Sequence, residues 1–203
     1  LEEGDVEWMT AGSGIVHSEN AVVSTGMRLF QLWLILPEAQ RNMAPRVQIL
    51  RRDSMPTYVA AGVVARVYSG SLGEAVAPTL NAVPTTLIDI RLDPGAIFKP
   101  ELPASYNAFI VGIEGEFNAG ENEVLGVNGV GWTGPQGEGQ SFLKLQAGLS
   151  GARLLLYAAQ PQNISVVSQG PFIAGSRTEL AGYYDAYRHG RFPHAGTMRP
   201  LTP

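Results

Sequence analysis

The chain alternates short apolar segments with glycine and proline, and this pattern predicts a protein built almost entirely from β-strands. Its 203 residues include 24 glycines and 14 prolines, spread along the whole length between the apolar segments. Many segments alternate apolar with polar or small residues, as strands with one buried face do. The predicted strands are 6–10, 14–18, 27–36, 48–50, 63–69, 85–92, 107–114, 116–119, 123–127, 129–133, 140–146, 152–159 and 165–169.

One α-helix is predicted near the C-terminus. Ser176 is followed three residues later by Glu179, a capping box in which each side chain accepts a hydrogen bond from a free backbone N–H. Gly190 then provides a C-terminal stop. An apolar and aromatic stripe follows the cap at helical spacing and comprises Leu180, Tyr183, Tyr184 and Tyr187. We expect this face to dock on the β-structure; the alternative is an aromatic platform for a ligand.

Composition narrows the range of functions. Hydrophobic residues make up 45% and charged residues 16%, which predicts a packed core. The net charge of −4 gives no basic excess, so direct binding to nucleic acid is not expected. Without cysteine, any metal must be held by His, Asp or Glu. No apolar run approaches the ~18 residues of a membrane span, and no signal peptide is visible, so we expect no membrane contact and a cytoplasmic or, in a eukaryote, nuclear location.

The first 20 residues contain the candidate chemistry. His17 is the only histidine before position 189, and Glu19 stands two positions after it. If Ile15 to Glu19 is a strand, alternation directs the His17 and Glu19 side chains to one face, where they can converge on one cation. Imidazole and carboxylate groups are suitable ligands for a metal cation. A lone His-x-Glu is common, however, and alone does not define a site.

Three stretches together resemble a known family: GDVEWMTAGSGIVHSE (4–19), LFQLWLILP (29–37) and QGPFI (169–173). They resemble the pirin family, bicupin proteins of the cupin superfamily, over residues 4 to about 192. The resemblance implies an all-β fold of two antiparallel β-barrels of the RmlC-like jelly-roll type, with a short C-terminal helix. The expected domains are a truncated N-terminal barrel at 1–75, a C-terminal barrel at 76–160, and a segment at 161–203 that packs back on the first barrel.

The resemblance also implies a metal site, usually iron, held in the N-terminal barrel by three histidines and one glutamate. By motif, His17 is the third histidine and Glu19 the glutamate, which is also the candidate catalytic proton acceptor. Gln31 is expected to face the metal cavity as a hydrogen-bond donor. The family's first two histidines form a His-x-His segment upstream of the Gly4-Asp5 turn, and the sequence begins after it. We therefore expect half a metal site, an incomplete first barrel and weak metal binding.

Two explanations of this incomplete barrel stay open. Either the sequence omits part of a longer protein, or it is a shortened pirin that forms a homodimer through its open N-terminal barrel. The second barrel has no histidine, because none occurs from 18 to 188, and we expect it to be free of metal.

Three functions fit these observations. The first is a metal-dependent dioxygenase of the quercetin 2,3-dioxygenase type, acting on a flavonol-like small molecule. The second is a non-catalytic regulator that binds a protein partner, either a transcription factor or a metabolic enzyme. The third is a degenerate cupin that has lost its metal.

Overall fold

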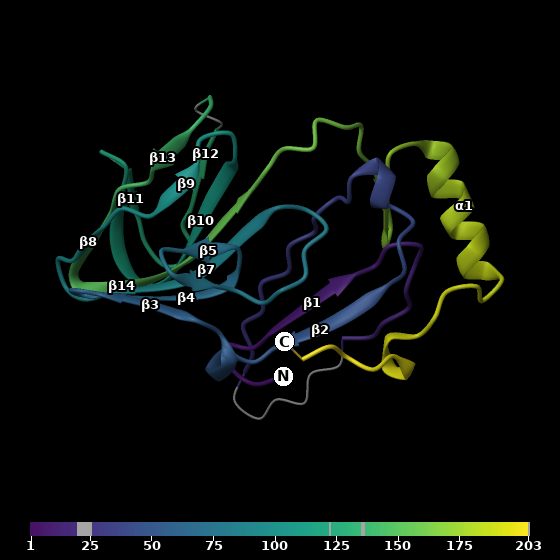
Figure 1. Ribbon diagram of the computed structural model, residues 1–203, viewed down its shortest axis with the longest axis horizontal. Coiled ribbons are helices and arrows are strands. Elements are labelled where there is room, and N and C mark those ends of the chain that lie inside the picture. The colour runs from purple at the N-terminus through teal and green to yellow at the C-terminus, as the bar shows by residue number, and fades with distance from the viewer. Residues whose placement is uncertain (20–25, 122, 135–136, 203) are drawn as a thin grey trace. The chain divides into compact units, whose positions relative to one another are not determined.

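The computed structural model describes residues 1–19, 26–121, 123–134 and 137–202, which form β-strands and one α-helix, α1 (Arg177–Arg188) (Figure 1). These ranges also contain three short 3-10 helices, Glu38–Gln40, Arg52–Ser54 and Ala195–Thr197. The strands are β1 (Val6–Thr10), β2 (Arg46–Leu50), β3 (Thr57–Ala60), β4 (Val63–Ser69), β5 (Ser71–Leu72), β6 (Ala75–Val76), β7 (Thr85–Leu92), β8 (Ile97–Phe98), β9 (Glu101–Pro103), β10 (Asn107–Ala119), β11 (Glu123–Leu125), β12 (Val130–Thr133), β13 (Gln140–Phe142), β14 (Leu145–Ala159), β15 (Val167–Gln169) and β16 (Phe172–Ala174). The predicted all-β class with a short C-terminal helix is confirmed.

The chain packs as two compact units. Unit 1 comprises Leu1–Val6 and Leu50–Pro161, and unit 2 comprises Glu7–Ile49 and Gln162–Thr202. Each unit therefore combines segments that are far apart in the sequence. The predicted domains 1–75, 76–160 and 161–203 stay a prediction.

Unit 1 is organised around an eight-stranded antiparallel sheet. Six strands follow the order β11-β10-β14-β7-β4-β3, while β12 also pairs with β10 and β8 with β14. The register places Ile110 of β10 beside Leu156 of β14, which lies beside Ile88 of β7 and then Val67 of β4. All four side chains are buried in one hydrophobic cluster. Alternation along the strands thus aligns one apolar row across the sheet, and this row is the core of the unit.

A tight turn precedes β1 and is held by a single carboxylate. Gly4 has φ +84°, a conformation that favours glycine. Asp5 accepts hydrogen bonds from the backbone N–H groups of Arg52 (2.9 Å) and Glu2 (3.0 Å), and from the Arg51 guanidinium at 2.6 Å. Burial raises the pKa of Asp5, but these hydrogen bonds outweigh it and the net pKa is lowered. The Gly4-Asp5 pair is therefore a structural turn held by charge and backbone donors.

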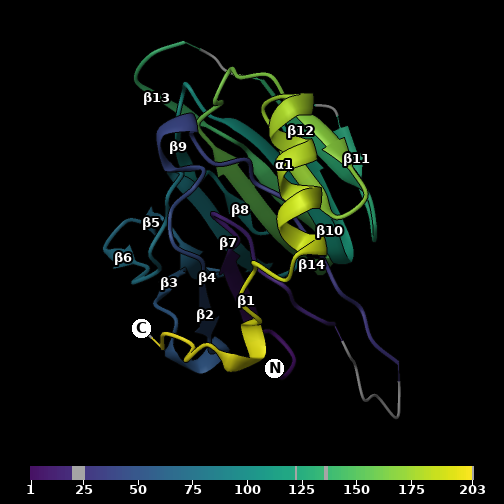
Figure 2. The same cartoon turned by 90° about the vertical axis from the view of Figure 1, so that its right-hand side faces the viewer.

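The predicted strand at 27–36 is wrong. Residues 26–37 adopt no regular structure, and Figure 2 draws them as a coil. Met27, Leu29 and Trp33 are exposed. A strand needs a hydrogen-bonded neighbour, and none of the strands in the described part of the chain pairs with this segment. The apolar pattern of residues 27–36 is typical of a strand, but the pattern does not show whether a neighbouring strand is present to pair with it.

Unit 2 contains small sheets and the helix. Among the described residues, β1 pairs with β2, almost wholly within unit 2, and β15 pairs with β16, so neither sheet closes into a barrel. This agrees with the predicted incomplete first barrel. The helix starts as predicted: the Ser176 hydroxyl accepts from the Glu179 N–H at 3.2 Å, and Glu179 in turn accepts from the Gly175 N–H at 2.8 Å. After the helix, Gly190 has φ +62°.

Candidate functional site

Two glycines fix the backbone that leads to His17, all within unit 2. Gly12 has φ +52°, and a Cβ atom there would lie 2.1 Å from the Met43 carbonyl oxygen. Gly14 has φ +125°, and its Cβ would lie 2.2 Å from the Phe192 ring. Any larger residue would collide with a neighbour and adopt an unfavourable φ. The glycines of the AGSG stretch are thus required by close packing as well as by their turn.

The predicted strand at 14–18 is reduced to one isolated bridge. Val16 pairs in parallel with His194: its N–H donates to the Pro193 carbonyl at 2.8 Å, and its own carbonyl accepts from Ala195 N–H at 2.8 Å. These two bonds hold the backbone directly before His17. The expected strand alternation therefore does not by itself explain where His17 and Glu19 point.

The structure nevertheless brings His17, Glu19 and Gln31 together. His17 Nδ1 lies 4.0 Å from Glu19 Oε1, and the Gln31 side-chain amide donates to the same oxygen at 2.7 Å. The His17 and Glu19 side chains are 32% and 54% exposed. Within the described part of the chain, both contacts of Glu19 use Oε1, so its second oxygen, Oε2, can take a ligand. The roles predicted for the three residues stay predictions.

The three side chains do not form a metal site by themselves. In residues 1–19, 26–121, 123–134 and 137–202, no group of three His, Cys, Asp or Glu side chains is placed to hold a metal ion. His17 and Glu19 are suitable donors for a divalent ion, but two protein ligands bind such an ion weakly. Since the residues present do not fit a complete metal site, we derive no chemical step through a metal.

The two remaining histidines lie elsewhere. His189 caps the end of α1, where Nδ1 is 2.8 Å from the Asp185 carbonyl oxygen. His194 is exposed, and its backbone lies beside Val16 rather than beside His17. Neither joins His17 and Glu19 in a cluster of ligands.

An ion pair that the sequence did not reveal anchors the start of α1. Arg41 Nη1 lies 2.9 Å from Glu179 Oε2, and the Tyr183 hydroxyl donates to Glu179 Oε1 at 2.7 Å. Burial raises the pKa of Glu179, but the bonds from Tyr183, the Gly175 N–H and Arg41 lower it overall. Burial and the bond to Glu179 raise the pKa of Tyr183 to about 12. The cap residue therefore also ties the helix to the segment around residue 41.

The tyrosines of α1 pack around one phenylalanine of β16. The Phe172 ring lies 4.8 Å from Tyr184 in an edge-on arrangement, and 6.3 and 6.1 Å from Tyr183 and Tyr187. Edge-to-face contacts at such distances are favourable. The tyrosine stripe thus packs against a β-strand, as the docking interpretation predicted.

Unit 1 contains a second charged network, centred on Arg153. Its guanidinium forms two hydrogen bonds with Asp89, at 3.0 Å from Nε and 2.8 Å from Nη2, and a third with Glu114 at 3.3 Å. The bonds to Asp89 raise the pKa of Arg153 despite its burial. Asp89 lies within β7, and its partner Arg153 stands 64 residues later, on β14. Burial and then the Asp89 charge raise the pKa of Tyr157 to about 12.

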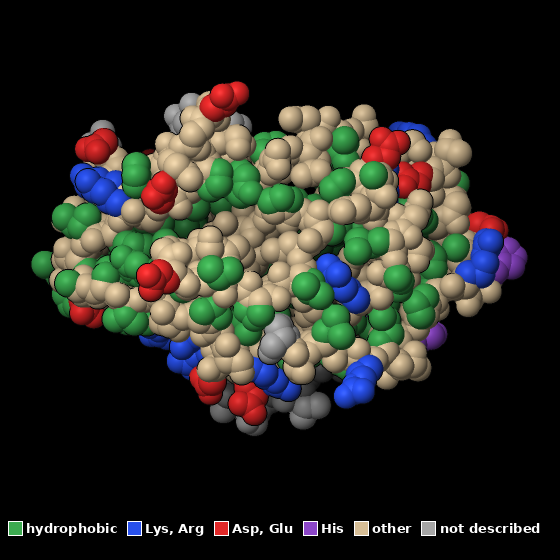
Figure 3. Space-filling view, in the orientation of Figure 1, with side chains coloured by type: hydrophobic (Ala, Val, Ile, Leu, Met, Phe, Trp, Pro, Cys, Tyr) green, Lys and Arg blue, Asp and Glu red, His purple; other side chains and the backbone are tan. Residues whose placement is uncertain are grey.

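The face of the molecule in Figure 3 shows no continuous charged stripe. On the face shown in Figure 3, basic and acidic side chains are interspersed. None of the helices in the described ranges is long and apolar enough to span a membrane.

Comparisons with known proteins place the chain in a family. A family model for the pirin C-terminal cupin domain matches residues 87–193, and a second pirin model matches residues 1–34. The chain is 33% identical to a pirin-like protein of Caulobacter vibrioides, over 93% of the chain and 68% of that protein. It is 31% identical to a pirin-like protein of Solanum lycopersicum, covering 94% of the chain but only 65% of that relative's length.

The fold comparison agrees. A crystal structure of a quercetin 2,3-dioxygenase from Acinetobacter baumannii superposes with a TM-score of 0.79 over 95% of the chain and 68% of that protein. The sequences are 22% identical, so this likeness describes the fold alone. The two family models cover the stretches at 4–19 and 169–173 and the first part of the stretch at 29–37. The chain belongs to the pirin family of the cupin superfamily.

Proposed function

We propose that this pirin acts as a metal-dependent dioxygenase on a flavonol-like small molecule, with His17 and Glu19 among the ligands of a divalent ion such as Fe(II). One observation carries the proposal: His17 and Glu19 approach to 4.0 Å although the segment is not a strand. Gln31 donates to Glu19 Oε1, and among the described residues no hydrogen bond or ion pair occupies Oε2. The family resemblance implies the metal, and His17 and Glu19 have the donor atoms that such an ion takes.

Within this proposal, each side chain has a separate task. Gln31 orients the Glu19 carboxylate, since a hydrogen bond to one oxygen restricts rotation of the group. Glu19 is the candidate base, because an exposed carboxylate can accept a proton from a bound hydroxyl group. His17 presents an imidazole nitrogen beside this carboxylate.

The test uses the full-length gene product reconstituted with Fe(II). Oxygen uptake with quercetin is measured together with iron content by elemental analysis. Bound iron and quercetin-dependent uptake, both lost in His17→Ala and Glu19→Gln but kept in His189→Ala, are the expected results. Iron binding without uptake would refute the dioxygenase function, and absence of both would favour the metal-free cupin.

A second function, association with a protein, is favoured by the exposed segment 26–37. Met27 and Leu29 are each 60% exposed, and Trp33 is 50% exposed. Neighbouring exposed apolar side chains often mark interaction surfaces. We propose that this segment contacts a protein partner or a second copy of the chain. Light scattering on wild type and on Leu29→Ser/Trp33→Ser tests the homodimer, and a pull-down with both proteins from the source cell tests a different partner.

A further inference from the structure

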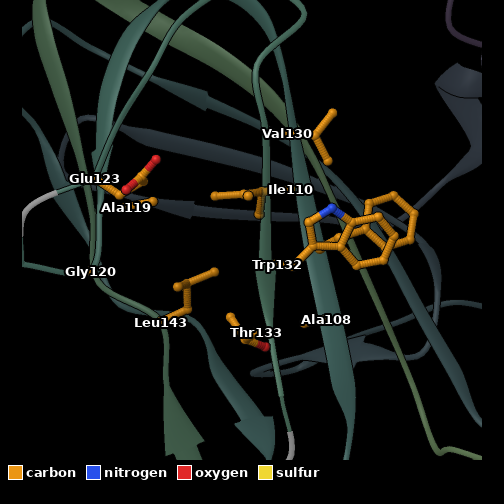
Figure 4. A pocket seen from close by; sticks show the side chains of 11 residues that line it. Ala108, Ile110, Ala119, Gly120, Glu123, Val130, Trp132, Thr133 and Leu143 are labelled. Atoms are coloured by element: carbon orange, nitrogen blue, oxygen red, sulfur yellow. The ribbon is translucent and has the colours of Figure 1, made fainter.

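The sheet of unit 1 ends at a strand with an open edge, β12. In the described part of the chain, β12 pairs with β10 alone, so no strand lies beside its second edge. All four residues of β12, Val130–Thr133, line a cavity of about 450 Å³, which Figure 4 shows from close by. The space beside this strand is therefore not filled by the described residues.

The register shows which backbone groups of β12 face the open edge. Directly before β12, the carbonyl of Gly129 accepts a hydrogen bond from the N–H of Gly112 at 2.9 Å. Hydrogen-bonded pairs alternate along an antiparallel ladder, so Gly131 directs its N–H and C=O to β10, whereas Val130 and Trp132 direct theirs to the open edge. Within the described ranges, neither of these two residues forms a backbone hydrogen bond with another segment. The edge thus presents N–H donors and C=O acceptors to an incoming strand.

The side chains at this edge are apolar and exposed. Trp132 is 75% exposed and Val130 is 45% exposed, and the two share one face of the sheet because they stand two positions apart. Figure 4 shows both on the opposite side from Ile110. The ring centroid of Trp132 lies 4.8 Å from that of Phe109, which stacks on Tyr157 of β14 at 4.6 Å. This row of rings therefore crosses the sheet and ends at the open edge, where its last ring is in solvent.

The strand β12 lacks two features that commonly protect an edge strand. Soluble proteins often place a charged residue or a proline at such an edge, which prevents pairing with another chain. The sequence of β12, VGWT, contains neither. At the other edge of the same sheet, Pro56 directly precedes β3, and the register places Arg66 opposite Thr57. Of the two edges, β12 is therefore the one more open to pairing.

The edge of β12 is complementary to itself. When two copies of the strand pair antiparallel about a twofold axis at Gly131, Val130 of one copy lies opposite Trp132 of the other. Both residues direct their backbone groups outward, so each Val130–Trp132 pair is a hydrogen-bonded pair. An aromatic ring opposite a β-branched side chain is a favourable cross-strand pair. Gly131 has no side chain, which lets the two strands approach closely at the axis.

We propose that β12 pairs with β12 of a second copy of the chain, so that the sheets of two copies of unit 1 join into one antiparallel sheet. This inference goes beyond the proposed function, and it does not involve the exposed segment 26–37, whose contacts are a separate hypothesis. A strand of four residues buries little surface. We therefore expect a weak, reversible dimer with a dissociation constant of about 0.1–1 mM.

Sedimentation equilibrium of the full chain, between about 0.01 and 1 mM, measures this association. Trp132→Lys brings like charges together across the axis, and Val130→Pro removes an outward N–H donor without removing a bond to β10. Each change should weaken the dimer at least about ten-fold. Val59→Lys introduces the same charge at a 70% exposed position of β3 and should leave the dimer unchanged. Leu29→Ser/Trp33→Ser, in the segment 26–37, should also leave it unchanged.

The register is tested by disulfide crosslinking, because the chain has no cysteine of its own. Gly131→Cys places a thiol at the twofold axis, where the atom nearest to the new Cβ is Leu125 Cδ1, the movable end of a side chain. This variant should crosslink two copies under mild oxidation much faster than Val59→Cys, which has its thiol on the other edge of the sheet. Circular dichroism spectra like that of the wild type show that each variant is folded.

Several results would overturn the proposal. They are a monomer at every concentration, a dimer that Trp132→Lys leaves intact, and equal crosslinking of Gly131→Cys and Val59→Cys. A dimer lost only in Leu29→Ser/Trp33→Ser would place the contact on the segment 26–37 instead. Larger oligomers that are also lost in Val59→Lys would show that β12 pairs with β3 of the next copy, which extends without closing.

Discussion

The sheet of unit 1 and the candidate site of unit 2 are stabilised in different ways. In the sheet, Val67, Ile88 and Leu156 belong to one buried row that spans neighbouring strands. At the candidate site, His17 and Glu19 are partly exposed, and one hydrogen bond from Gln31 orients the carboxylate. The candidate functional residues therefore lie where few contacts hold the side chains in place. The best packed region of the chain contains no histidine.

The largest expected effect comes from opening the core of unit 1. Phe117 is 1% exposed, so Phe117→Ala leaves a cavity and should lower the free energy of unfolding by about 3–5 kcal/mol. Leu29→Ala, in the exposed segment of unit 2, should change it by less than about 0.5 kcal/mol. Urea unfolding measures both. Similar losses in the two variants would show that residues 26–37 are packed in solution, and would remove the contrast between the units.

A somewhat smaller loss is expected when the buried ion pair of unit 1 is broken. Asp89 is 5% exposed, and Arg153→Met leaves its carboxylate without its main partner. Such a change typically costs about 3 kcal/mol or more. The double variant Asp89→Leu/Arg153→Met removes both charges and should recover much of the loss in urea unfolding. No recovery would show that packing of the arginine side chain matters more than its charge.

The unit 1 network also predicts a loss of stability in alkali. Burial, with the Asp89 charge, raises the pKa of Tyr157 from 10.0 to about 12, so the folded state favours the neutral phenol. This contribution is complete below pH 10.0 and is lost as the pH rises through about 12. It amounts to roughly 2–3 kcal/mol, since each pKa unit corresponds to about 1.4 kcal/mol.

The check on this effect is Tyr157→Phe, which cannot ionise at that position. Its free energy of unfolding should decline less steeply with pH over the same range than that of the wild type. Tyr68, whose pKa is also raised to about 12, by burial and then by Asp89, should account for part of the remaining slope. Equal slopes in wild type and Tyr157→Phe would refute the prediction.

The sequence pattern located the core better than it located the site. The predicted bounds of the strands 63–69 and 85–92 match the observed bounds. Such apolar strands can be recognised from their own residues alone. The strand at 27–36 failed because pairing is a property of two segments, and periodicity describes only one of them. Arg41 and Arg153 were missed for a similar reason: their partners lie 138 and 64 residues away.

The candidate site was found through its family motif. His17, Glu19 and Gln31 were named from the resemblance, and the structure brings them together although the segment is not the strand that alternation assumed. The backbone before His17 is instead fixed by Gly12, which packs against Met43, and by Gly14, which packs against Phe192. Both contacts join residues that are distant in the sequence. The aromatic cluster of Phe109, Trp132 and Tyr157 in unit 1 gave no sequence signal, since its rings come from three separate strands.

The smallest expected effect on stability belongs to the candidate site itself. In metal-free protein, Glu19→Gln should change the free energy of unfolding by less than about 0.5 kcal/mol, because the side chain is exposed and has few contacts. In the full-length protein, the same change should weaken Fe(II) binding by at least about ten-fold, and Gln31→Leu should do so to a lesser extent. Glu7→Gln, at an exposed position of β1, is the matched control for charge. If Glu19→Gln loses stability in the metal-free protein, the Glu19 carboxylate has a structural role. The hydrogen bond from Gln31 would then stabilise the loop instead of orienting a metal ligand.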